Sequence, residues 1–124
     1  MIRAVAASAA IVLLLTADPA GAAPPRRTEL TVSYVADGGH AAAVKLRCDP
    51  AGGVHPRKVQ ACRSLARVGG NPGRLTPAAR MCTTEYAPIT ARVRGTWQGR
   101  KVNWSRAFGN RCDMHRTTGV LTAF

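Results

Sequence analysis

Residues 29–48 read ELTVSYVADGGHAAAVKLRC, and their pattern is the strongest indication of the fold class. In the first part apolar and polar residues alternate, so that Leu30, Val32 and Tyr34 share one face. A period of two is typical of a strand with one buried face. The same alternation returns over 43–48, after the turn residues Asp-Gly-Gly at 37–39. Two alternating segments joined by a glycine turn predict an antiparallel pair of strands.

One main helix is predicted in the middle of the chain. Pro56 is placed to open this helix, which runs to about Val68 and ends at the two glycines that follow. We expect its buried stripe to hold the apolar residues at helical spacing, which are Val59, Cys62, Leu65 or Ala66, and Val68. A short second helix is expected after Thr76, because Pro77 suits the first position of a helical turn.

The second half of the chain returns to strand patterns. Alternating apolar residues predict strands over 89–97, 102–108 and 120–124, and the segment 109–114 between the last two is predicted to be a loop. Arg106 interrupts the apolar face of the strand at 102–108, and the pattern does not explain it. About five short strands with one main helix predict an antiparallel α+β domain.

The N-terminal segment is predicted to be a secretory signal peptide over residues 1–23. A short positive start at residues 1–3 precedes an apolar run over 4–17, and small residues follow at 20–23. The alternative is an uncleaved anchor, but the run is shorter than the roughly 20 residues that span a bilayer. Residues 24–124 then form one domain. We expect a secreted, extracellular protein with no membrane segment after cleavage.

Four cysteines lie in the predicted mature part, at positions 48, 62, 82 and 112. An even number of cysteines in an exported chain predicts disulfides. Three pairings are possible on arithmetic alone, and the sequential pairing is the simplest. A metal site is not indicated, because there is no C-x-x-C motif and no histidine lies at chelating spacing from a cysteine. We expect two disulfides, no metal and no cofactor.

The charge is strongly positive. The chain has 18 Lys and Arg against 6 Asp and Glu, which gives a formal net charge of +12. Such a charge attracts anions and nucleic acid without specificity, and it also keeps a secreted protein soluble. Aromatic residues make up only 5% of the chain, and no RNP, helix-turn-helix or zinc-finger motif is present. No specific nucleic-acid partner is therefore predicted.

Catalytic patterns are absent from the sequence. There is no G-x-S-x-G motif, and the carboxylates are scattered along the chain without an obvious acid–base pair. His40, His55 and His115 are predicted to be solvent-exposed loop residues. The protein is not expected to be an enzyme.

The segment Arg80-Met81-Cys82-Thr83-Thr84-Glu85-Tyr86-Ala87-Pro88 has no regular period. Pro88 restricts the preceding residue to extended backbone, and the threonines also favour an extended chain. If Cys82 is bridged to a distant partner, this segment is a stiff, extended, exposed loop held at one end. Such a loop is what a protease binds as substrate.

The chain from about Leu30 to Phe124 resembles the Streptomyces subtilisin inhibitor family. Any single matching piece is weak, but the order and spacing of all of them are specific. The matching segments are 44–48, 53–56, Cys62 with 68–70, 81–82, 86–88, 95–100, 106–108, 110–114 and 122–124.

This resemblance implies a secreted proteinaceous inhibitor of serine proteases, especially subtilisin-like ones, with a five-stranded antiparallel sheet and two helices. It implies the disulfides Cys48–Cys62 and Cys82–Cys112, and a homodimer formed through sheet faces. The reactive bond of the family corresponds to Thr84–Glu85. Met81, Cys82, Thr83 and Tyr86 are then the other residues of the loop that contact the protease.

Two further residues are expected to support the loop. The amide of Asn110 is placed to hydrogen-bond loop carbonyls, and Pro88 stiffens the exit of the loop. The chain departs from the family at Thr83, where proline is common, and at Thr84, where methionine or lysine is common. The competing interpretation is a cationic secreted protein that binds nucleic acid or an anionic surface through the same scaffold, with a loop that does not inhibit.

Overall fold

A computed structural model describes residues 11–12 and 27–124 of the chain. The predicted signal peptide, residues 1–23, therefore lies outside the described residues except for Ile11 and Val12. The described domain is built on one antiparallel sheet in the order β3-β2-β1-β4-β5. The strands are β1 (Thr28–Ala36), β2 (Ala41–Cys48), β3 (Gly52–Gly53), β4 (Ile89–Trp97) and β5 (Arg100–Phe108).

The predicted strand pair is confirmed. β1 pairs with β2 on one side and with β4 on the other, so that Val32 lies opposite both Val44 and Val93. Leu30, Val32 and Tyr34 are all buried, as their alternation predicts. A shift of one residue would turn these side chains to the other face, so the hydrophobic pattern determines the register.

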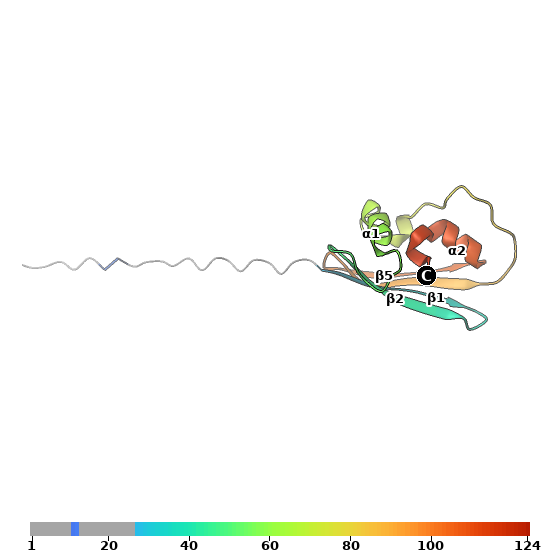
Figure 1. Ribbon diagram of the computed structural model, residues 1–124, viewed down its shortest axis with the longest axis horizontal. Coiled ribbons are helices and arrows are strands. Elements are labelled where there is room, and N and C mark those ends of the chain that lie inside the picture. The colour runs from blue at the N-terminus through green and yellow to red at the C-terminus, as the bar shows by residue number, and fades with distance from the viewer. Residues whose placement is uncertain (1–10, 13–26) are drawn as a thin grey trace, which may run out of the picture.

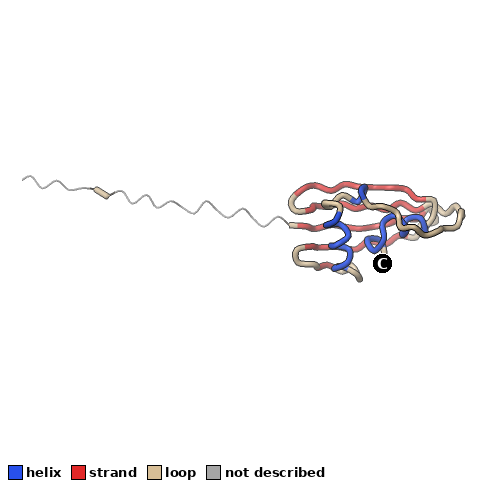
Figure 2. Tube along the Cα trace, turned by 90° about the horizontal axis from the view of Figure 1, so that it is seen from above, coloured by secondary structure: helices blue, strands red, loops and turns tan. Residues whose placement is uncertain are grey.

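Both helices lie on the same face of the sheet (Figures 1 and 2). They are α1 (Lys58–Arg67) and α2 (Arg111–Thr118), and the 3-10 turns are η1 (Pro72–Arg74) and η2 (Gly119–Thr122). The main core lies between α1, η2 and the middle of the sheet. A smaller cluster, centred on Tyr34, Phe108 and Met114, lies under α2. The other face of the sheet has no layer over it in the described domain (Figure 1).

The main helix is confirmed, but its buried stripe differs from the prediction. Leu65 is fully buried, as predicted, but Ala61, which lies outside the predicted stripe, is also fully buried, and Val59 is 45% exposed. The disulfide joins Cys62 to Cys48 at the end of β2. The Cys62 side of the helix therefore lies against the end of β2, while Ala61 and Leu65 face the core.

Two predicted elements near the C-terminus are wrong. The segment 109–114 is not a loop but includes the start of α2, and 120–124 is not a strand, because η2 occupies most of it. Asn110 explains the helix start, since its Oδ1 accepts a hydrogen bond from Asp113 N at 2.8 Å. Leu121 is fully buried, so the tight turn of η2 places an apolar side chain in the main core.

Two of the three histidines also differ from the prediction. His55 is buried, and because its Nδ1 accepts a bond from Arg57 N, its Nε2 donates to Leu121 O at 3.0 Å. His115 is partly buried beside Thr122. Burial, assisted by nearby Arg111 and Arg80, lowers the pKa of His115. His40 is exposed, as predicted.

Arg106 now has a structural explanation. Its guanidinium carbon lies 5.1 Å from the centre of the Phe108 ring, which is buried at the end of β5. Arginine over an aromatic face is a favourable cation–π contact. The side chain therefore lies along the apolar face while its charge stays in solvent.

Candidate functional site

A long irregular segment connects η1 to β4. Residues 75–88 contain no helix or strand, so the helical turn predicted after Thr76 is wrong. Ala78 N donates to Arg116 O at 2.8 Å, which ties the segment to α2 in place of a local helical bond. Beyond this point the chain curves outward past α2 before it returns to the sheet (Figure 1).

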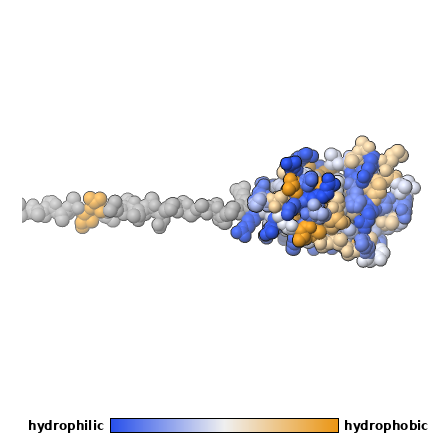
Figure 3. Space-filling model, in the orientation of Figure 1, coloured by the Kyte–Doolittle hydropathy of each residue, from blue (hydrophilic) through white to orange (hydrophobic). Residues whose placement is uncertain are grey.

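The outer part of this segment, residues 81–86, is here called the projecting loop. Met81 is 96% exposed and Tyr86 is 84% exposed. Thr83, Thr84 and Glu85 are exposed as well, and only Cys82 is partly buried. In the space-filling view hydrophobic and hydrophilic side chains are interspersed over this side of the domain (Figure 3). Large apolar side chains held in solvent on an ordered segment are typical of a protein-binding site.

Several bonds hold the projecting loop at both ends. The disulfide Cys82–Cys112 joins its start to α2, with 5.7 Å between the two Cα atoms. Ala87 N donates to Gly109 O at 2.8 Å, just after the loop. The carbonyl of Pro88 then accepts a bond from Asp37 N at 3.0 Å. Both predicted disulfides, Cys48–Cys62 and Cys82–Cys112, are confirmed.

Asn110 holds the middle of the loop. Its Nδ2 donates to Thr83 O at 3.0 Å and to Glu85 O at 2.8 Å, which are the carbonyls on either side of Thr84. Its Oδ1 is already engaged as the cap of α2, so the orientation of the amide is set by the helix. The residue is 8% exposed. Thr84 is therefore presented outward from a backbone that is fixed on both sides.

Sequence reasoning missed part of this support. The loop depends on the carbonyls of Gly109 and Arg116, which bind the chain just after and just before it. Backbone carbonyls leave no mark in a sequence, because every residue has one. The Asn110–Asp113 spacing did carry a signal, since asparagine followed three residues later by an acid is typical of a helix start.

The hollow beneath the loop is small. It has a volume of about 200 Å³ and is lined by residues of the loop and of the start of α2, including Thr83, Glu85, Asn110 and Cys112. Ligand pockets are usually about 300 Å³ or more. The geometry favours recognition of the loop by a partner rather than capture of a small molecule beneath it.

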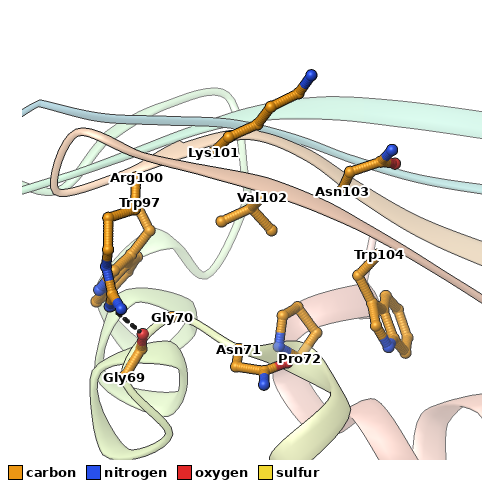
Figure 4. A pocket seen from close by; sticks show the side chains of 10 residues that line it. All are labelled: Gly69, Gly70, Asn71, Pro72, Trp97, Arg100, Lys101, Val102, Asn103 and Trp104. Carbon is orange, nitrogen blue, oxygen red and sulfur yellow. Dashed lines mark hydrogen bonds between the residues drawn. The ribbon is translucent and has the colours of Figure 1, made fainter.

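A second hollow lies between β5 and the segment after α1, with a volume of about 310 Å³ (Figure 4). Residues that line this hollow make contacts between the end of α1 and the sheet. Arg100 Nη2 donates to Gly69 O at 3.0 Å. Gly70 lies so close to the Trp97 ring that a Cβ there would come within 2.1 Å of it. These contacts fasten the end of α1 to the sheet.

Other kinds of site find no support in the described part of the chain. Across 11–12 and 27–124, no group of three or more His, Cys, Asp or Glu side chains is arranged to hold a metal ion. Within the same residues, no helix is long and apolar enough to cross a membrane.

The fold and the site define a class of protein. It is a small α+β domain with two disulfides, one of which braces an exposed irregular segment. Residues 9–110 match the subtilisin inhibitor-like family. The chain belongs to this family, which consists of protease inhibitors and not of enzymes.

Individual relatives agree with this assignment. Subtilisin inhibitor-like protein 3 of Streptomyces coelicolor is 42% identical over 94 residues, which cover 75% of this chain and 74% of that protein. Subtilisin inhibitor-like protein 1 of Streptomyces cacaoi is 34% identical over 93 residues, covering 72% and 84%. Sermetstatin of Streptomyces caespitosus, solved in complex with Bacillus licheniformis subtilisin, matches with a TM-score of 0.68 and 27% identity, covering 79% of this chain and 99% of that one. The predicted family and fold class are confirmed.

Proposed function

We propose that the chain is a secreted inhibitor of subtilisin-like serine proteases and that the projecting loop enters the protease active site. The observation that carries this proposal is the pair of hydrogen bonds from Asn110 to the carbonyls on either side of Thr84. In this proposal they hold the exposed Thr84 in the pose of a substrate. Membership of a family of protease inhibitors supports the same conclusion.

The reactive bond in this proposal is Thr84–Glu85. Thr84 fills the main specificity pocket of the protease, and the protease serine attacks its carbonyl. Met81, Cys82 and Thr83 occupy the preceding subsites, while Glu85 and Tyr86 lie on the leaving side. All of these side chains except that of Cys82 are exposed, so the protease can reach them without unfolding the domain.

Inhibition follows from the rigidity of the loop. Because the disulfide Cys82–Cys112 and Asn110 already order the loop, little conformational entropy is lost on binding. If the bond is cut, the same supports hold the new amine near the acyl carbon. Religation then competes with hydrolysis, because the two ends are kept together. The loop therefore stays bound in the protease active site, because its net hydrolysis is slow.

The residue at Thr84 limits the choice of protease. A small β-branched side chain buries less apolar area than methionine, which weakens contact in a deep pocket by about 1 to 2 kcal/mol. It also offers no cation to a trypsin-like pocket. The proposed targets are subtilisin-like or elastase-like enzymes with a permissive pocket. Met81, almost fully exposed, supplies a further apolar contact.

Secretion and assembly are parts of the same proposal. Residues 1–23 act as the signal peptide, and residues 24–124 form the mature extracellular inhibitor. The homodimer through sheet faces, which the family resemblance implies, stays a prediction.

The test is a titration of the oxidised protein against subtilisin and trypsin, together with Thr84→Lys. We expect the parent protein to inhibit subtilisin stoichiometrically. Thr84→Lys should gain inhibition of trypsin, because lysine supplies the cation that the trypsin pocket binds. Thr83→Lys is the matched control: it adds the same charge one residue away and should not gain trypsin inhibition. Loss of subtilisin inhibition in all three proteins, or equal gains by both variants, would contradict the assignment.

A further inference from the structure

A third hollow is lined by three basic side chains that come from different parts of the chain. It has a volume of about 470 Å³, which lies in the range of ligand pockets. Its basic residues are Arg57, just before α1, Arg80, just before the projecting loop, and His115 on α2. This hollow is distinct from the small one beneath the loop, because the two have no lining residue in common.

Backbone hydrogen bonds hold both arginines at the hollow. Arg57 N donates to Nδ1 of the buried His55 at 3.0 Å. Arg80 N donates to Ala78 O at 2.8 Å, and Ala78 N donates in turn to Arg116 O on α2. The backbone of each arginine is therefore fixed by bonds to the fold, while its side chain is exposed to solvent.

A chain of hydrogen bonds determines which nitrogen of His115 carries the proton. Thr118 Oγ1 uses its proton to donate to Met114 O at 2.8 Å. In the 2.6 Å contact between the hydroxyls of Thr118 and Thr122, the donor must then be Thr122. The proton of Thr122 is thereby used, so its oxygen accepts from His115 Nδ1 at 3.1 Å. Neutral His115 therefore has its lone pair on Nε2, where a proton from solvent is added.

The charges around His115 are positive. Burial lowers the pKa of His115, and the nearby charges of Arg111 and Arg80 lower it further. Arg57 contributes another positive charge to the wall of the same hollow. An anion bound among these groups would offset their mutual repulsion.

Few groups of the protein compete for these cations. In the part of the chain that the structure describes, the one ion pair is Asp113–Arg116, which involves none of the three basic residues of the hollow. The Phe124 carbonyl, on the wall of the hollow, accepts from the Tyr34 hydroxyl at 3.0 Å. The last carbonyls of α2 accept hydrogen bonds within the fold, at Met114, His115 and Arg116.

We propose that this hollow binds a phosphate group between Arg57, Arg80 and the protonated Nε2 of His115. Arginine binds phosphate oxygens bidentately, and its guanidinium keeps its charge at every relevant pH. Donors from three separate segments suit a tetrahedral ion with several oxygens better than a planar carboxylate with two. The hollow also leaves room beside the phosphate group, so the ligand is either inorganic phosphate or a phosphate monoester.

The experiment follows the ring protons of the histidines by NMR during a pH titration, in sodium phosphate and in sodium chloride of equal ionic strength. We expect the pKa of His115 to be higher in phosphate by about 1, because a bound anion favours the protonated ring. His40 is the internal reference, since it is exposed and lies outside the hollow. An equal response of both histidines to phosphate, or no response of His115, would overturn the proposal.

Substitutions test whether the arginines of the hollow are responsible. Arg80→Gln should weaken phosphate binding at least about 10-fold, since hydrogen bonds to a charged group are lost. Arg57→Gln should have a similar effect from another wall of the hollow. Arg63→Gln is the matched control, because it removes the same charge from an exposed position of α1 that does not line the hollow. A loss by Arg63→Gln equal to that by Arg80→Gln would show diffuse attraction and overturn the proposal.

Three further arms identify the ligand and the proton. Tighter binding of glycerol phosphate than of inorganic phosphate would identify the ligand as a monoester, whereas equal or weaker binding would identify it as the free ion. Acetate should not raise the pKa of His115, and a rise equal to that in phosphate would overturn the choice of ligand. Nitrogen-15 NMR without phosphate should show the neutral ring of His115 protonated at Nδ1. Protonation at Nε2 instead would contradict the site.

This inference goes beyond the proposed inhibitory function and does not depend on it. Phosphate binding is measured on the oxidised protein alone, without a protease.

Discussion

At the scale of single residues, Asn110 has two tasks. Its oxygen caps α2 and its nitrogen holds the carbonyls on either side of Thr84. The helix therefore determines where the loop lies. The family resemblance alone suggested Asn110 as a support, but the cap explains why its amide has only one useful orientation.

The two tasks of Asn110 can be separated by substitution. Serine keeps a capping oxygen but is too short to donate to both loop carbonyls. We expect Asn110→Ser to weaken protease inhibition by about 10- to 100-fold, since two hydrogen bonds of roughly 0.5–1.5 kcal/mol each are lost. The melting temperature should change little. The measurements are an inhibition constant and a thermal melt.

Asn71 provides the control for this substitution. It caps η1 through its own side-chain oxygen, which accepts from Gly73 N at 3.0 Å, and it has no bond to the loop. Asn71→Ser should leave the inhibition constant unchanged. If Asn110→Ser also left it unchanged, the support proposed for the loop would be wrong.

At the scale of elements, the two disulfides close loops of different kinds. Cys48–Cys62 joins β2 to α1 within the core and spans 14 residues, whereas Cys82–Cys112 braces the projecting loop and spans 30. In the chain-entropy account these bonds stabilise the fold by about 3 and about 4 kcal/mol. Measurements of stability therefore do not distinguish the roles of the two disulfides. Measurements of protease inhibition do.

Replacing each pair of cysteines by serine tests this distinction. Both double variants should lower the free energy of unfolding by several kcal/mol. Below both melting temperatures, loss of Cys82–Cys112 should weaken inhibition strongly and speed cleavage of the loop, because the loop must then be ordered on binding. Loss of Cys48–Cys62 should leave the inhibition constant close to that of the parent. The opposite order of effects would contradict the role given to the loop disulfide.

The elements also show what a sequence can predict. Strands β1, β2, β4 and β5 were predictable because a period of two is a local property of the chain. Helix α2 was not recognised, since its buried positions include Thr117 and Thr118, which carry no hydrophobic signal. Thr118 can be buried because its hydroxyl donates to Met114 O at 2.8 Å. The two-residue strand β3 depends on pairing with β2, which a local pattern does not reveal.

The position of the loop and its disulfide could be predicted from the sequence, but the backbone hydrogen bonds that hold the loop could not. The loop could be located from its proline, its threonines and its lack of period, and the resemblance supplied the disulfide partner of Cys82. The backbone hydrogen bonds donated by Ala78 and Ala87 could not be predicted, because they join segments that are distant in sequence and depend on where α2 lies. The buried position of His55 depends in the same way on Leu121.

At the scale of the whole molecule, the sheet separates two surfaces. The helices and the projecting loop lie on one side, and the face of the sheet without a covering layer lies on the other (Figure 1). Five of the cations behind the net charge of +12 lie on that second face: Lys45, Arg47, Arg92, Arg94 and Lys101.

The central claim is that the loop inhibits through the Thr84–Glu85 bond. The most direct test is to hold the oxidised protein with a trace of subtilisin and to locate the cut bond by mass spectrometry. We predict a single slow cut, giving a product one water molecule heavier that stays joined by Cys82–Cys112. Reduction should then release two fragments that end at Thr84 and begin at Glu85. Rapid cleavage without inhibition, or a cut at any other bond, would contradict the claim.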